Sequence, residues 1–336
     1  MRTHGGDRVL GNWINRGDLI KVAEKIREQG PRLLRRLRIR PAQRTRAQWR
    51  ETFRGTVPSD PLNIPFLRRR WRFQATGDPE LDHRRYVAQR YLQGRGGLTA
   101  LSLGSGPGRI ETAWAQTGLF ARIDGIELSP ELVADARARA RSLGLDAIVR
   151  FHEGDAGRPP YPLPKYDLVI SEGALHHLQP MSRVIPALAS ALDPRGLLVM
   201  LEFCGPDRFQ WTRNQLALTR QALEIIPAQW RLKDNGRLKR RVYRPGRLRM
   251  ILSDPSEAVE SSRILPVMHR HFDALEEKPL GGNIVNLVFY EITRHFLQPD
   301  PGAIGLLEKI CALEEEELRS NRMASDYWFG VYRLRL

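Results

Sequence analysis

Short apolar runs alternate with amphipathic segments through the middle of the 336-residue chain. Runs of four to eight apolar residues between polar turns are typical of buried strands, and apolar positions every three to four residues are typical of helices. The predicted strands are 98–103, 122–126, 148–152, 166–171 and 196–203. The predicted helices are 109–118, 130–143 and 181–192. This alternation indicates a parallel sheet covered by helices on both faces.

Weaker patterns flank this region. Before it, a helix is predicted over 78–93, with Asp78 as its N-cap and Pro79 in its first turn. After it, the pattern predicts three further groups of elements: helices at 211–226 and 255–272, a strand at 274–278, then helices at 283–297 and 301–319. A last strand, 327–334, is expected to insert antiparallel into the sheet. The acidic run 314–317 is interpreted as a solvated helix face.

The most informative stretch joins the first strand to its helix. Gly104, Gly106 and Gly108 form the turn together with Ser105. Glycines at such a turn adopt positive φ freely and let the backbone approach a ligand, next to the positive end of a helix. Glu127 ends the next strand, where a carboxylate can accept hydrogen bonds from both hydroxyls of a ribose.

The spacing of these glycines bears on which ligand fits. A dinucleotide-binding turn follows G-x-G-x-x-G. Here the pattern is G-x-G-x-G, and Arg109 occupies the position where the third glycine would stand. The turn therefore disfavours a pyrophosphate and favours a ligand that has a ribose and a carboxylate, namely S-adenosylmethionine.

Five stretches, in order and at regular spacings, carry a resemblance to a known family. They read LSLGSGPGRIE (101–111), IDGIELS (123–129), FHEGDA (151–156), YDLVISEGALHHL (166–178) and DPRGLLVMLEF (193–203). With them the chain resembles the Rossmann-like class I S-adenosylmethionine-dependent methyltransferases. The resemblance implies an α/β fold with a seven-stranded, mostly parallel sheet whose last strand is antiparallel. It also implies S-adenosyl-L-methionine as the cofactor.

The resemblance assigns further cofactor contacts. Leu128 would lie against the adenine. The Asp155 carboxylate would accept a hydrogen bond from the adenine amino group, and the Ala156 amide would lie nearby. Ser171 and Glu172 would line the methionine end of the cofactor, where Glu172 could also face the ammonium group. Two shorter stretches, 205–211 and 254–265, also resemble a bacterial branch found beside glycan and natural-product genes.

Candidate catalytic residues follow the fourth and fifth strands. His176 and His177 come a few residues after the fourth strand, and Glu202 ends its expected neighbour. A histidine oriented by a carboxylate is an effective general base. One histidine of the pair is therefore expected to deprotonate a hydroxyl, with Glu202 orienting it, and O-methylation of a small molecule or glycan is expected. N-methylation of an amine, which needs no strong base, is the alternative. The chemistry requires no metal.

Charge is distributed unevenly. Residues 1–100 carry 23 Lys and Arg against 9 Asp and Glu, a net of +14 within a total of +16. The extension 1–75, with its basic segment 32–40, is interpreted first as a plain solvated face, then as a contact with an anionic membrane surface or substrate, and last as a contact with nucleic acid. Arginine outnumbers lysine 47 to 7, which also suits a GC-rich genome without any polyanionic partner. A nucleic-acid-binding protein built on a methyltransferase-like fold is the alternative outside enzymes.

Four regions and a cellular setting are predicted. The regions are a basic extension (1–75), a cofactor-binding core (76–204), an insertion that caps the substrate (205–272) and a part that completes the sheet (273–336).

Cys204 and Cys311 lie too far apart in sequence to indicate a disulfide framework or a metal motif. His269 and His271 are not spaced i, i+4, so one helix face would not present both to a metal. The N-terminus lacks a secretory hydrophobic stretch, and a cytoplasmic protein is expected.

Overall fold

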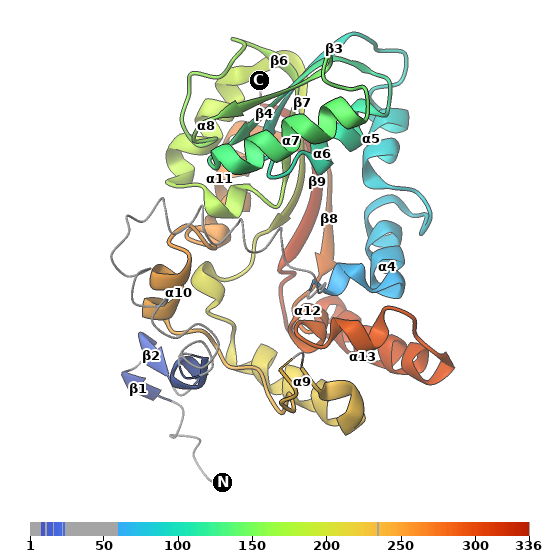
Figure 1. The fold of residues 1–336 in the computed structure, drawn as a ribbon, viewed down its shortest axis with the longest axis vertical. Coiled ribbons are helices and arrows are strands. Elements are labelled where there is room, and N and C mark those ends of the chain that lie inside the picture. Colours follow the sequence, from blue (N-terminus) through green and yellow to red (C-terminus); the bar gives the residue numbers. More distant parts are fainter. Residues whose placement is uncertain are drawn as a thin grey trace.

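A seven-stranded sheet forms the centre of the structure, a computed structural model that describes residues 8–10, 12–15, 17–21, 23, 60–233 and 235–335 (Figure 1). Its strands are β3 (Leu98–Leu103), β4 (Phe120–Glu127), β5 (Val149–Glu153), β6 (Tyr166–Glu172), β7 (Leu192–Phe203), β8 (Phe272–Gly281) and β9 (Tyr327–Leu334). The strand order is β5-β4-β3-β6-β7-β9-β8. β3 to β7 are parallel, and β9 pairs antiparallel with both β7 and β8. The predicted fold class is confirmed.

Helices cover both faces of this sheet. One face carries α5 (His83–Tyr91), α6 (Arg109–Ala115) and α7 (Pro130–Ser142), whose Val87, Trp114 and Val133 enter one apolar core. The other face carries α8 (Met181–Ala191) and α11 (Ile264–His271), which bury Leu188 and Met268 in a second core. The sheet is buried on both sides, as the near-continuous apolar runs of β3 and β6 require.

A helical lobe with its own core lies beyond the carboxyl ends of the parallel strands (Figure 1). It contains α4 (Pro65–Thr76), α9 (Arg213–Glu224), α12 (Val285–Phe289) and α13 (Pro301–Arg319). β7 leads into the lobe and β9 begins from it, and the Cys204 amide donates to the Asp326 carbonyl oxygen at 2.7 Å. The lobe therefore borders the edge of the sheet where parallel α/β folds bind ligands.

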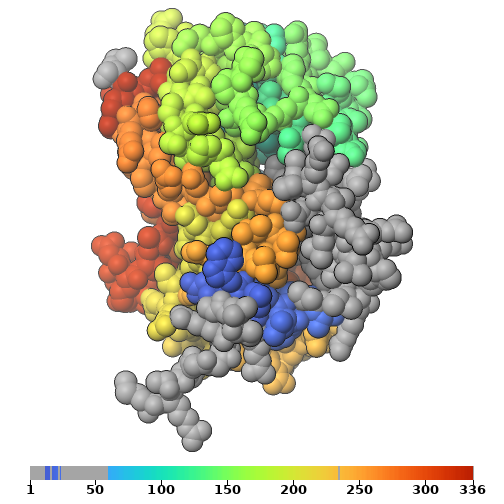
Figure 2. All heavy atoms as spheres, turned by 90° about the vertical axis from the view of Figure 1, so that its left-hand side faces the viewer, coloured from blue at the N-terminus to red at the C-terminus, as the bar shows by residue number. Residues whose placement is uncertain are grey.

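The described part of the N-terminal extension packs against this lobe. β1 (Arg8–Leu10) and β2 (Ile14–Asn15) form a small antiparallel pair, and β2 contacts α10 (Arg247–Ser253) (Figure 1). In Figure 2 the described residues of the extension, in blue, lie on the surface beside orange atoms of the later chain. The Asp18 carboxylate accepts from the Gly246 amide at 2.9 Å and from Arg249 at 2.7 Å. The basic segment 32–40 lies outside the described residues.

Short 3-10 helices join the larger elements. They are η1 (Pro61–Asn63), η2 (Leu175–His177), η3 (Asp207–Phe209), η4 (Ala228–Arg231), η5 (Ser261–Arg263) and η6 (Thr293–Phe296). Among the residues that the structure describes, none of the helices has the length and apolar character that crossing a bilayer requires.

Three predicted helices differ from the structure. The first begins at His83 instead of near Asp78, because the Asp82 carboxylate caps it by accepting from the Arg84 amide at 3.0 Å. Of the helix predicted over 255–272, only the second half is helical, as α11 (Ile264–His271). The first half is not, since the chain has a positive φ of 47° at Ala258. The helix predicted over 283–297 is interrupted between α12 and η6, where Glu291 has a φ of 67°.

The acidic run on α13 is also different from the prediction. Glu314 is fully buried, and its carboxylate accepts from the amides of Gly282, Ile284 and Val285 at 2.7 to 3.1 Å. Arg70 of α4 lies 3.3 Å from the same carboxylate. The interpretation of a solvated face is therefore wrong at Glu314, which satisfies the free amides at the start of α12.

Candidate functional site

The glycine turn after β3 has the backbone that the sequence predicted. Gly104, Gly106 and Gly108 all have positive φ, from 52° to 77°. Gly108 is the N-cap of α6, and a Cβ atom there would lie 2.7 Å from Cζ of Phe151 and 3.1 Å from Cα of Ala136. A side chain at this position would therefore both strain the backbone and push α7 and β5 away.

Glu127, at the end of β4, lies directly against this turn. Its Oε2 accepts from the Gly106 amide at 2.9 Å, and its Oε1 accepts from the Ser129 amide at 2.7 Å. The residue is almost completely buried. A carboxylate at the end of this strand is of the type that accepts hydrogen bonds from ribose hydroxyls.

A buried polar atom at the turn supports the presence of a ligand there. Ser105 is buried, and within the described part of the chain its Oγ has no hydrogen-bond partner. Buried hydroxyls are normally satisfied, so this atom fits a partner that a bound molecule supplies. The Gly104 position is tight, because a Cβ there would lie 3.0 Å from Cβ of Ala174 in the loop after β6. These residues fit S-adenosylmethionine as a bound group.

Of the three residues expected around an adenine, Asp155 lines a hollow of about 280 Å³, whereas Leu128 and Ala156 are not among its lining residues. Ile126, Asp155 and Tyr161 belong to its lining, and Ala156 is buried beside it. Asp155 is exposed and pairs with Arg158 at 3.1 Å while its Oδ1 accepts from the Gly157 amide. Leu128 is half-buried next to Glu127.

Glu172 lies in a cluster with cationic and polar side chains. Its carboxylate pairs with both Arg84 and His83 of α5 and accepts from the Trp114 indole at 2.8 Å. Burial raises the pKa of this carboxyl, but His83 and Arg84 outweigh it and hold the pKa at about 2. Glu172 is thus an ion-pair partner of α5. A cofactor ammonium that contacted Glu172 would bind the same carboxylate as Arg84.

Glu202 and His176 meet as predicted from the ends of neighbouring strands. Nδ1 of His176 lies 2.8 Å from Oε2 of Glu202. The other oxygen, Oε1, accepts from the Ser171 hydroxyl and from the amides of Ala174 and Leu175, at 2.6 to 2.7 Å. One buried carboxylate therefore fixes both the loop after β6 and the orientation of the imidazole on it.

The two histidines differ in their electrostatics. Burial lowers the pKa of His176, but Glu202 and then Glu257 outweigh it, so the pKa is raised. Burial and then the neighbouring His176 lower the pKa of His177 well below its usual range. The two rings are 4.1 Å apart between centroids, and Nδ1 of His177 lies 3.3 Å from the Ser256 hydroxyl.

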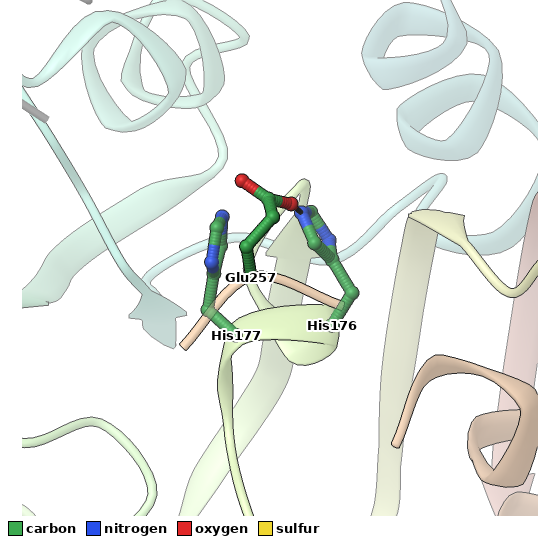
Figure 3. A group of neighbouring side chains, drawn as sticks. All are labelled: His176, His177 and Glu257. Carbon is green, nitrogen blue, oxygen red and sulfur yellow. Dashed lines mark ion pairs between the residues drawn. The ribbon is translucent and has the colours of Figure 1, made fainter. Parts of the chain in front are cut away.

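Glu257 is a site residue that the sequence did not reveal. It belongs to the segment 254–260, whose Val259 amide donates to the His176 carbonyl at 3.3 Å and whose Glu260 accepts from the Met181 amide at 2.7 Å. Oε1 of Glu257 lies 3.6 Å from Nε2 of His176 (Figure 3). No spacing rule links positions about 80 residues apart, and only the fold brings them together.

Comparisons with known proteins agree with this geometry. The family model described as a methyltransferase domain matches residues 101–200. Residues 101–200 belong to the class I S-adenosylmethionine-dependent methyltransferases. S-adenosylmethionine is the cofactor of this class. The matched methyltransferase domain contains the glycine turn, Glu127 and the histidine pair.

Relatives of the methyltransferase domain act on different molecules. The demethylmenaquinone methyltransferase of Thermus thermophilus is 31% identical over 108 residues, covering 32% of this chain and 48% of the relative. The erythromycin 3''-O-methyltransferase of Saccharopolyspora erythraea is 27% identical over 170 residues, covering 48% of this chain and 53% of the relative. The chain thus spans about half the length of the curated relatives it matches. The names of these relatives do not single out one branch.

Solved structures resemble the chain more loosely. Geranyl diphosphate C-methyltransferase from Streptomyces coelicolor is 15% identical, with a TM-score of 0.44, over 77% of this chain and 86% of that one.

Proposed function

We propose that the protein is an S-adenosylmethionine-dependent methyltransferase that methylates a hydroxyl group on a small-molecule natural product or glycan. His176 acts as the general base and Glu202 orients it. The observation that carries this proposal is the 2.8 Å contact between Nδ1 of His176 and Oε2 of Glu202. It occurs on the loop that follows β6, next to the glycine turn where the cofactor of this class binds.

The cofactor contacts follow from the site. The turn at Gly104 to Gly108, with the carboxylate of Glu127, would hold the ribose and methionine parts, and Ile126 with Asp155 would border the adenine. Bound there, S-adenosylmethionine supplies a methyl group on a positively charged sulfur. The chain has to place an acceptor oxygen in line with that methyl, and positioning of this kind accounts for a large part of catalysis.

The histidine's role follows from its tautomer. An ionised carboxylate only accepts hydrogen bonds, so Nδ1 of His176 carries the proton that it donates to Glu202. Nε2 is then the basic nitrogen, and it takes the proton that leaves the acceptor hydroxyl. Glu202 stabilises the imidazolium that forms, just as its charge raises the pKa of His176.

The helical lobe supports a role for residues 205–272 as the substrate cap. The segment 254–260 reaches the histidine pair, and Ser261 Oγ donates to the Gly205 carbonyl at 2.9 Å, which closes the insertion on itself. An acceptor bound between β6, β7 and this segment would be shielded from water. Asn15 and Asp18 of the N-terminal extension hydrogen-bond to the backbone of Arg244 and Gly246 in the same insertion.

N-methylation of an amine is the second candidate, and one observation favours it. Glu257 lies 3.6 Å from Nε2 of His176, the nitrogen that would face the acceptor, so a carboxylate borders the proposed position of the acceptor. A cationic amine suits such surroundings better than a neutral hydroxyl. Its conversion to the reactive free amine needs only a weak base.

A screen of paired acceptors decides between the two. Release of S-adenosylhomocysteine is measured with compounds that differ only in a hydroxyl or an amine at one position, across sugars, glycans and polyketide-like molecules. Turnover with the hydroxyl member of a pair supports O-methylation. Turnover confined to the amine members contradicts it.

A further inference from the structure

We propose that His176, His177 and Glu257 form a binding site for a divalent transition-metal cation of the zinc type. One ligand atom from each residue lies within 4.8 Å of the other two. Figure 3 shows the Glu257 carboxylate beside both imidazole rings. The histidines come from η2, after β6, and the glutamate comes from the separate segment 254–260, so the fold assembles the cluster from two places.

The spacing of the His176 and Glu257 ligand atoms fits a tetrahedral cation. Two ligands that are each about 2.1 Å from zinc and at a tetrahedral angle lie about 3.4 Å from each other. Nε2 of His176 is 3.6 Å from Oε1 of Glu257. The pair therefore needs only a small shift to share one cation.

The nitrogen of His176 that faces Glu257 is held in the form that binds metals. Metal-binding histidines usually donate the other ring N–H to a carboxylate, which fixes the tautomer and the ring orientation. Nδ1 of His176 donates to Glu202 at 2.8 Å, which leaves Nε2 with the lone pair. Glu202 is held in turn by Ser171 and two amides, so this support is rigid.

The same arrangement is repeated behind His177. The Ser256 hydroxyl donates its proton to Oδ1 of Asp254 at 2.7 Å, so it accepts from Nδ1 of His177 at 3.3 Å. His176 thus contacts the Glu202 carboxylate directly, and His177 is linked to the Asp254 carboxylate through Ser256.

The donor set selects the kind of cation. Two imidazole nitrogens and one carboxylate oxygen suit zinc, iron, cobalt or nickel, whereas magnesium and calcium prefer oxygen ligands alone. Three protein ligands leave at least one coordination position for water or for a substrate oxygen.

This site overlaps the proposed catalytic base, so the consequence for activity rests on the proposed function. A cation bound to Nε2 of His176 occupies the lone pair that would otherwise take the proton from the substrate hydroxyl. We therefore expect the metal-free protein to be the active form and zinc to inhibit methyl transfer. Metal binding itself does not depend on methyl transfer.

Cobalt(II) provides the direct test, because its visible absorption reports imidazole coordination. Full-length protein dialysed against a chelator is titrated with Co²⁺, and Zn²⁺ is then added to displace it. One tight Co²⁺ per chain, displaced by one Zn²⁺, is expected. Glu257→Gln and His177→Gln should each weaken Co²⁺ binding by at least about tenfold.

Matched surface variants serve as controls. His269 pairs with Glu277 on the exposed side of α11, and Glu224 pairs with Arg220 on α9. His269→Gln and Glu224→Gln should leave the Co²⁺ spectrum and affinity unchanged. Absence of a visible band in the parent, or equal loss of binding in the control variants and in Glu257→Gln, overturns the proposal.

The two proposals fail in different measurements. Calorimetric binding of S-adenosylmethionine to the metal-free protein tests the methyltransferase assignment and does not require the cluster. Co²⁺ binding with no cofactor binding supports the metal site and refutes the methyltransferase assignment. Cofactor binding without a Co²⁺ band supports the methyltransferase assignment and refutes the metal site.

Discussion

The imidazole of His176 and the carboxylate of Glu202 form a hydrogen bond of 2.8 Å between the ends of two neighbouring parallel strands. The same carboxylate also holds the loop that carries the histidine, through the amides of Ala174 and Leu175. Orientation of the base and shape of the loop are therefore linked, because both depend on one buried glutamate.

Removal of the imidazole should abolish most catalysis without loss of the cofactor. His176→Ala is expected to lower kcat about 10²- to 10⁴-fold, the usual contribution of a positioned general base, and to leave the KM for S-adenosylmethionine unchanged. Added imidazole should restore part of the rate, which a purely structural role would not allow. The measurement uses metal-free protein and a hydroxyl acceptor found in the paired screen. If His176→Ala and His177→Ala both retain near-normal turnover, the base lies elsewhere.

Two glycines with the same φ allow strain and crowding at the glycine turn to be separated. Gly108 and Gly118 both have a φ of 77°, but a Cβ at Gly118 would meet nothing within 4 Å. Gly118→Ala should cost about 1 kcal/mol of unfolding free energy, from backbone strain alone. Gly108→Ala should cost about 1–3 kcal/mol more, because its Cβ would lie 2.7 Å from Cζ of Phe151. Urea unfolding measures both, and equal losses would be inconsistent with the close packing of this turn.

The buried ion pairs of Glu172 should make stability depend on acid pH. The native pKa of about 2 lies below the ordinary value of 4.5, so the unfolded chain binds the proton more tightly. The contribution is fully present above about pH 4.5 and is lost as the pH falls towards 2, on the order of 3 kcal/mol in all. Unfolding free energies at pH 6, 4 and 3 should therefore fall more steeply in the parent than in Glu172→Gln. The exposed substitution Glu224→Gln should follow the parent, and parallel curves for all three proteins would refute the effect.

Two neighbouring glutamates on α13 should differ sharply in importance. Glu314 is buried and accepts three amides, whereas the side chain of Glu315 is 45% exposed and pairs with Arg70 at 3.0 Å. Glu314→Gln removes a buried charge partner and should cost about 3 kcal/mol. Glu315→Gln should cost less than about 1 kcal/mol. Comparable thermal unfolding midpoints for the two variants would mean that Glu314 does not hold α12 and α4 together.

The sequence was sufficient for features that depend on local pattern. Apolar runs such as Leu98–Leu103 located the strands of the parallel sheet, because a buried strand must be apolar on both faces. The contact of His176 with Glu202 followed as well, since residues at the carboxyl ends of adjacent strands lie close together.

Features that depend on distant segments could not be predicted. Glu257 reaches His176 only because the insertion after β7 folds back over the loop after β6. The acidic run on α13 looks the same in sequence whether it is solvated or caps another helix, and only the position of α12 makes Glu314 buried. The start of α5 was misplaced because Asp78 and Asp82 are equally good capping residues.

Cofactor binding by the glycine turn and Glu127 is tested most directly by isothermal titration calorimetry with S-adenosylmethionine and S-adenosylhomocysteine. The parent and Glu224→Gln are predicted to bind one molecule per chain with the same affinity. Glu127→Gln, which loses the charge that is proposed to accept the ribose hydroxyls, is predicted to bind at least about tenfold more weakly, a difference of about 1.4 kcal/mol. Absence of binding heat in the parent, or an unchanged affinity in Glu127→Gln, would contradict a methyltransferase site at this turn.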